Sequence, residues 1–153
     1  MVWVGDFMGV HLFTNGVWTD SGRIYRNSLN LIENYIDRAS IETDGTISAT
    51  ENYRMFYGKV EQGKTYTIDE NTTLCGFFEN EPTLDSQTYN SQRIYQTSPT
   101  FTAPITGYFC YRKLYSSSTA MMNEGTSLLP YEPYNVVDWY INYGHGYSSG
   151  AWS

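Results

Sequence analysis

The strongest constraint in the sequence is a series of short runs in which apolar and polar residues alternate, each closed by turn residues. Residues 54–60 put bulky or apolar groups on both faces of a strand, so we expect a central strand there. Residues 65–68 set Tyr66 and Ile68 against two threonines, as in a half-buried strand. No stretch has the period of a helix. About seven to nine such strands, at intervals of roughly ten residues, predict an all-β fold, an antiparallel β-sandwich.

Turn residues mark the places where these strands should reverse direction. The pairs Asn15-Gly16 and Asp44-Gly45 each lie between two β-type runs, and Asn-Gly is the strongest short-range signal for a hairpin. Within residues 99–115, Pro104 predicts a further hairpin, with Phe101 facing inward before it. Residues 79–92 are polar and rich in turn formers, so we expect a loop there.

The composition is that of a folded acidic protein. The 153 residues carry a net charge of -7, and 17% of them are aromatic, which is far from the composition of a disordered chain. Such a chain can bury the core of one domain. Its three Lys and scattered Arg form no basic stripe, so we expect no nucleic-acid partner. The N-terminus has no basic start and no run approaches about eighteen apolar residues, so we expect neither secretion nor membrane insertion.

The two cysteines, Cys75 and Cys110, fall inside expected strands. A free thiol in such a place usually behaves as a small buried hydrophobe, which is the interpretation we favour. A disulfide would require the two strands to be neighbours, with a Cα separation that the sequence does not supply. Both interpretations stay open at this point.

The segment MMNEGTSLLPYEPY, residues 121–134, separates the strand-rich body from a tail of different composition. We expect its methionines to end the last strand of the body and Tyr131 and Tyr134 to fold back over the core, in directions set by the prolines. The chain then divides into three parts. These are an N-terminal aromatic arm or extra hairpin (1–28), a β-sandwich domain (29–134), and a C-terminal strand with a flexible tail (135–153).

The two ends carry aromatic residues suited to assembly. Residues 1–28 are either an additional pair of strands or an arm that docks on a neighbouring subunit through exposed aromatics. The tail is either a last edge strand or a strand added to a partner in a symmetric homo-oligomer, with a trimer favoured. The assembly candidates are Trp3, Phe7, Trp18, Trp139, Tyr143 and Trp152.

Five pieces of the sequence occur in an order that is found in one protein family. They are NLIENYID, GTISATENYR, VEQGKTYTI, TFTAPITGYF and MMNEGTSLLPYEPY. With them the chain resembles a recurrent module of tailed-bacteriophage structural proteins, over about residues 29–134. The resemblance implies a jelly roll similar to carbohydrate-binding modules, as found in minor structural, head- or tail-fibre and receptor-binding proteins. It implies a place in the virion, other virion proteins as partners, and host-surface polysaccharide as a ligand.

Catalytic motifs are missing from the sequence. His11 and His145 each stand alone, and there is no Gly-x-Ser-x-Gly elbow, His-Glu-x-x-His helix or Cys-x-x-Cys pair. Folding could still bring two carboxylates together to cleave a glycoside, so a cell-wall glycan hydrolase stays as the weaker alternative. We expect a protein that is not an enzyme and needs no cofactor.

Carboxylates gather in the polar region between residues 69 and 85, and oxygen ligands of this kind can hold Ca²⁺. Their spacing is not that of an EF-hand, and an acidic loop in an acidic protein is ordinarily solvated. We therefore expect no metal site.

Sugar binding is the better functional hypothesis, because aromatic rings cover the apolar faces of pyranose rings while acids and amides bind the hydroxyls. The candidate rings are Tyr53, Tyr57, Tyr89, Tyr95, Tyr111 and Tyr115. The competing hypothesis is a purely structural spacer or assembly subunit that binds no ligand.

Overall fold

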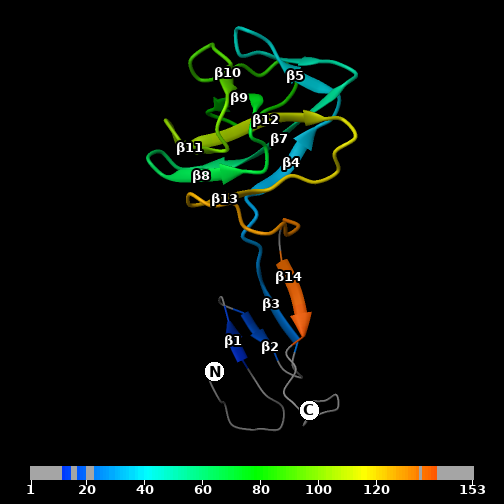
Figure 1. Ribbon diagram of the computed structural model, residues 1–153, viewed down its shortest axis with the longest axis vertical. Helices are drawn as coiled ribbons and strands as arrows, with labels where there is room; N and C mark the ends of the chain where they lie inside the picture. The colour runs from blue at the N-terminus through cyan, green and yellow to red at the C-terminus, as the bar shows by residue number, and fades with distance from the viewer. Residues whose placement is uncertain (1–11, 15–16, 20–22, 135, 141–153) are drawn as a thin grey trace. The chain divides into compact units, whose positions relative to one another are not determined.

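A computed structural model describes residues 12–14, 17–19, 23–134 and 136–140, which fall into two compact units (Figure 1). One unit contains both ends of the chain, residues 1–28 and 135–153. Within it, β1 (Leu12–Thr14) pairs antiparallel with β2 (Val17–Thr19), as expected around Asn15-Gly16. In the same unit, β3 (Arg23–Asn27) pairs antiparallel with β14 (Val136–Tyr140). The larger unit, Leu29–Tyr134, contains the sandwich.

Two antiparallel sheets form the sandwich, which confirms the predicted fold class (Figure 1). The five-stranded sheet has the order β10 (Ile94–Gln96), β9 (Thr73–Phe78), β12 (Gly107–Leu114), β7 (Tyr53–Val60) and β4 (Ile32–Ile36). The three-stranded sheet has the order β11 (Thr100–Thr102), β8 (Thr65–Ile68) and β13 (Met122–Glu124). No helix able to cross a membrane occurs among the residues placed by the structure.

The main core lies between the two sheets and is dominated by aromatic rings. Alternation along β12 turns Phe109 and Tyr111 into this core, where both side chains are fully buried. From the three-stranded sheet, Tyr66 and Met122 enter the same cluster. Phe101 is stacked on Phe109 with ring centroids 4.1 Å apart, so its predicted inward orientation is confirmed.

A second, smaller core covers the other face of the five-stranded sheet. The hairpin of β5 (Ala39–Ile41) and β6 (Ile47–Ala49), which turns at Asp44-Gly45 as predicted, contributes three apolar side chains to it. Met55 of β7 and Phe78 of β9 pack against them. Because β7 is buried on both faces and has a strand on each side, its prediction as a central strand is confirmed.

The predicted hairpin within residues 99–115 is wrong. β11 pairs with β8 in one sheet, whereas β12 pairs with β7 and β9 in the other, so the turn at Pro104 carries the chain between sheets. Side chains reinforce the β11–β8 pairing, because the hydroxyls of Thr67 and Thr100 are 3.0 Å apart. Alternation is identical for a hairpin and for a crossover, so the pattern could not distinguish them.

Both cysteines are free and buried, which confirms the interpretation favoured from the sequence. They lie on adjacent strands, with Cys75 opposite Tyr111 and Cys110 opposite Gly76. Cys75 points into the main core and Cys110 into the smaller one, so the thiols are on opposite faces of one sheet. This arrangement leaves no geometry for a disulfide between them.

The closing segment 121–134 begins with β13, so its first residues end the body as expected. Its tyrosines do not fold back over the core: Tyr131 is 52% exposed and Tyr134 is 41% exposed. Two buried amides anchor the segment instead. The Asn30 Nδ2 donates to the carbonyl of Glu132, and the Asn123 Oδ1 accepts from the backbone of Leu129. Hydrogen bonds from these two side-chain amides to the backbone therefore hold this segment.

Candidate functional site

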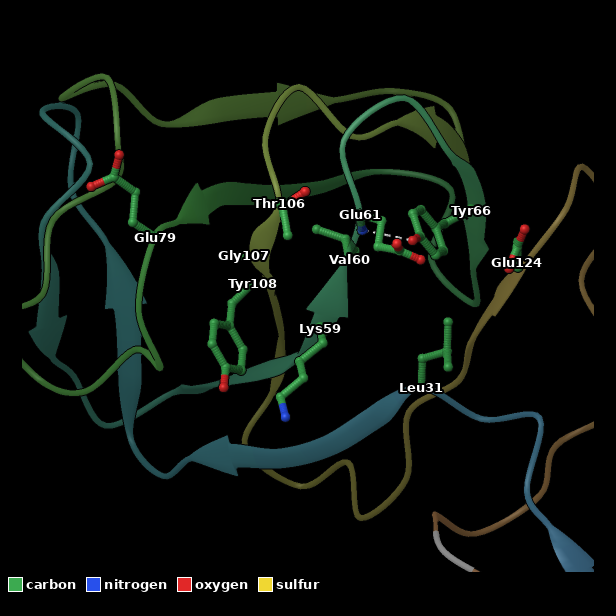
Figure 2. Close-up of a pocket in the computed structure, with 10 residues that line it drawn as sticks. All are labelled: Leu31, Lys59, Val60, Glu61, Tyr66, Glu79, Thr106, Gly107, Tyr108 and Glu124. Atoms are coloured by element: carbon green, nitrogen blue, oxygen red, sulfur yellow. Dashed lines mark hydrogen bonds between the residues drawn. The ribbon is translucent and has the colours of Figure 1, made fainter.

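A hollow opens at the rim of the sandwich, where β7 ends and β12 begins (Figure 2). Its volume is about 420 Å³. We call it the rim pocket; it is lined by Leu31, Lys59, Val60, Glu61, Tyr66, Glu79, Thr106, Gly107, Tyr108 and Glu124. Both sheets contribute to this lining, so the pocket exists only in the folded sandwich.

Hydrogen bonds in the turns fix the shape of the rim. The backbone N–H of Glu61 donates to the Tyr66 hydroxyl at 2.8 Å, as Figure 2 shows, and the N–H of Gln62 donates to Thr106 Oγ1 at 3.0 Å. At Gly107 a Cβ atom would lie 2.3 Å from the carbonyl oxygen of Phe78. Glycine therefore allows β12 to start directly against the end of β9.

Charged groups surround the apolar floor of the rim pocket. Lys64 Nζ lies 2.7 Å from Glu61 Oε1 and 3.9 Å from Glu124 Oε1, so this exposed lysine links two lining carboxylates. Its hydrogen bond with Glu61 raises the pKa of Lys64 above its usual value. Lys59 and Glu79 make no ion pair within the described part of the chain. Their charged groups are thus available to a ligand.

Tyr108 is the aromatic surface of the rim pocket. It is half-buried and faces Lys59 across the β7–β12 pairing (Figure 2). Its ring meets that of Tyr57 edge-on, with ring centroids 6.0 Å apart. The contact with Tyr57 fixes the ring in one orientation. The lining also includes the hydroxyl of Thr106 and, across the end of β7, the aliphatic side chain of Leu31 (Figure 2). An apolar surface bordered by charged and hydroxyl groups suits a polyhydroxylated ligand such as a sugar.

Two of the tyrosines proposed from the sequence cannot contact a ligand, because they are buried. Tyr111 is 0% exposed and donates a hydrogen bond to Asp69 Oδ1 at 2.7 Å. Tyr57 is 4% exposed and donates to Glu81 Oε2 at 2.7 Å. Burial is the main cause that raises the pKa of each phenol. Tyr111 lies in the main core and Tyr57 in the smaller one, because both faces of the five-stranded sheet are covered.

The other four proposed tyrosines do not form one face. Tyr53 lies under the Arg112 guanidinium, and Tyr115 lies under that of Arg38, at 3.8 and 4.7 Å from the ring centroids. Tyr95 projects from β10 and is 67% exposed. Tyr89 is 40% exposed and lines a separate, polar hollow of about 410 Å³ made by the loop over residues 79–92.

The assembly candidates fall mainly outside the described residues. Trp3, Phe7, Tyr143 and Trp152 lie there, as do both histidines. Trp18 is on β2 and Trp139 is on β14, opposite Ile24 of β3.

Sequence reasoning missed the residues that make the rim pocket. Tyr108 is the second residue of β12, and Leu31 directly precedes β4, so neither stands out from the other aromatic and apolar residues of the strands. The pairing of β7 with β12 on one side and with β4 on the other brings them to one rim. No motif encodes this pairing.

The acidic residues between 69 and 85 disperse on folding. Asp69 and Glu70 face Lys113, whereas Glu81 accepts a hydrogen bond from Tyr57. Within the described ranges no three His, Cys, Asp or Glu side chains come together as metal ligands.

Comparisons of the chain with protein-family models, curated proteins and solved structures found no match.

Proposed function

We propose that this chain is a non-enzymatic bacteriophage virion protein, a minor structural, fibre or decoration subunit, whose sandwich binds host-surface glycan in the rim pocket. The observation that carries the binding proposal is the combination of the Tyr108 ring with a neighbouring amine and carboxylate that have no ion-pair partner among the described side chains. The virion setting rests on the order of the five sequence pieces described above.

Each part of the rim pocket matches one part of a sugar. The Tyr108 ring can cover the C–H face of a pyranose, which removes apolar area from water. Glu79 can accept hydrogen bonds from ring hydroxyls, and Lys59 can donate to ring or hydroxyl oxygens. Glu61 and Glu124 are already held by Lys64, so they serve as a fixed wall.

Replacing Tyr108 by alanine should weaken glycan binding about fivefold or more, because loss of a central aromatic contact typically costs over about 1 kcal/mol. Lys59→Ala, at an exposed position, should weaken it severalfold with no loss of stability. The measurement is a glycan array with the full chain, followed by titration calorimetry on the best ligand.

The matched control is Tyr95→Ala, which removes an equally large but more exposed ring outside the rim pocket. Its affinity should stay within about twofold of the wild type, since surface contacts outside a site contribute little. If Tyr95→Ala abolishes binding while the two rim variants retain it, the site is misplaced. Absence of binding to any host cell-wall glycan rejects the proposed function.

A second function, assembly into a homo-oligomer, is favoured by the pairing of β3 with β14. This pairing brings residues from both ends of the chain into one unit, apart from the sandwich cores. A terminal unit of this kind can join subunits without using the residues of the rim pocket. The two functions are compatible in one virion protein.

Deleting residues 136–153 should abolish the oligomer and leave a folded sandwich. The deletion removes β14, the strand that pairs with β3, while both cores within Leu29–Tyr134 keep all their side chains. Light scattering gives the mass and circular dichroism the strand content. A truncation after Tyr140, which keeps β14, is the control for this strand. An unchanged oligomer in the longer deletion refutes the assembly role.

A further inference from the structure

Four polar side chains form a cluster that connects the two sheets. Lys113 of β12 places its Nζ 2.7 Å from Asp69 Oδ2 and 3.7 Å from Glu70 Oε2. Tyr111, two residues before it on the same strand, donates to Asp69 Oδ1 at 2.7 Å. Asp69 directly follows β8 of the three-stranded sheet, whereas β12 is in the five-stranded sheet. The cluster therefore spans the sandwich.

Lys113 differs from the other two lysines of the chain in its burial. Its side chain is 9% exposed, whereas that of Lys64 is 45% exposed and Lys59 is on the surface. The Nζ is fixed by a further hydrogen bond to the carbonyl oxygen of Thr119 at 3.0 Å, and it lies 5.9 Å from the ring centroid of Phe56. An amine held in one position beside a carboxyl group has the geometry for a condensation.

We propose that Lys113 and Asp69 form an intramolecular isopeptide bond that joins the two sheets covalently. A bond forms between Lys113 Nζ and Asp69 Cγ, and the bond between Cγ and Oδ2 breaks. That oxygen leaves as water with two of the three protons of the ammonium group. The reaction changes no oxidation state and needs no external reagent.

Glu70 is positioned to move the two protons. Its carboxyl is partly buried, and this desolvation raises its pKa, which makes the Glu70 carboxylate a better proton acceptor. It can accept a proton from Nζ and deliver one to the departing oxygen of Asp69, and it ends in its starting protonation state. Tyr111 stabilises the negative charge that develops on Oδ1, because its hydroxyl already points at that oxygen.

An ion pair is the competing state of the same cluster. In water an amine and a carboxylic acid remain ions, but groups aligned within one molecule reach effective molarities of about 10⁵ M or more, which favours condensation. The two states use the same side chains, but the bonded state lacks Asp69 Oδ2 and the charge on Nζ. They differ by the mass of one water molecule, which is directly measurable.

Intact mass spectrometry of the purified full chain tests the proposal. We expect the main species to be lighter than the sequence mass by one water, and fragmentation to place residues 69 and 113 in one branched peptide. Lys113→Arg keeps the positive charge and Glu70→Gln keeps the shape, and both should show the full mass with wild-type strand content. Lys64→Arg, in an exposed ion pair, is the matched control and should lose one water like the wild type.

Three results would overturn the proposal in whole or in part. A wild-type chain of full mass overturns the bond itself. Loss of water that persists in Lys113→Arg assigns the loss to another site, such as cyclisation at Asp44-Gly45, and overturns it equally. If Glu70→Gln still loses one water while Lys113→Arg does not, the proton-transfer role given to Glu70 is overturned.

Discussion

Replacing Asn30 by alanine should lower the free energy of unfolding by about 3 to 5 kcal/mol, because several buried backbone groups lose a partner. Its Nδ2 donates to the carbonyls of Ala120 and Glu132, both at 2.8 Å. Its Oδ1 accepts from the N–H groups of Ile32 at 3.0 Å and Met122 at 3.2 Å. One amide thus binds β4, β13 and the closing segment together.

Denaturation in urea measures the effect of this substitution. The control is Asn34→Ala: Asn34 is exposed and its Oδ1 accepts from the neighbouring N–H of Tyr35, so a loss below about 1 kcal/mol is expected. Asn30→Asp keeps both acceptor contacts but sets a buried carboxylate oxygen against the carbonyls of Ala120 and Glu132, so it should cost at least as much as Asn30→Ala. Equal stability of Asn30→Ala and Asn34→Ala would contradict a central role for Asn30.

Gly58→Ala should destabilise the sandwich by about 3 kcal/mol or more. A Cβ at this position would lie 2.0 Å from the carbonyl oxygen of Leu31 and 2.8 Å from its carbonyl carbon, so backbone would have to move. Gly58 pairs with Ile32 at the irregularity in the β4–β7 register. The substitution should therefore push β4, the edge strand of the five-stranded sheet, away from β7.

Gly63→Ala separates this clash from the general cost of replacing a glycine. Gly63 has φ +87°, and a Cβ added there would have no atom within 4 Å. An alanine at this position therefore meets only the strain of the left-handed conformation, about 1 kcal/mol. Chemical denaturation of both variants gives the comparison. If Gly63→Ala is the more damaging of the two, close strand approach is not what fixes Gly58.

The sequence was sufficient for the fold class, because alternation depends only on which side chains are buried. Thr65–Ile68 became β8, and Tyr66 and Ile68 are buried as the pattern requires. Thr67 is also buried, since its hydroxyl bonds to Gly125 and Thr100. Alternation alone cannot show that a threonine on the polar side of a strand will be covered.

Sheet membership could not be predicted in the same way. A strand that pairs with its sequence neighbour and one that crosses to the other sheet have the same local pattern, as β11 and β12 demonstrate. The rim pocket depends on such long-range pairings, so its residues could not be selected. The outward tyrosines of the closing segment were missed because Asn30 and Asn123, far apart in sequence, take over the anchoring.

The placement of the two cysteines makes this protein a convenient subject for site-specific labelling. The sequence contains only two cysteines, and both thiols are buried. Burial raises the pKa of Cys75 to about 12 and that of Cys110 well above its usual value, so neither forms a reactive thiolate near neutral pH. A single cysteine introduced at exposed position 62, whose backbone bonds to the lining residue Thr106, would then be the one site open to a fluorophore and would leave the lining side chains unchanged. Its emission would report directly on what enters the rim pocket.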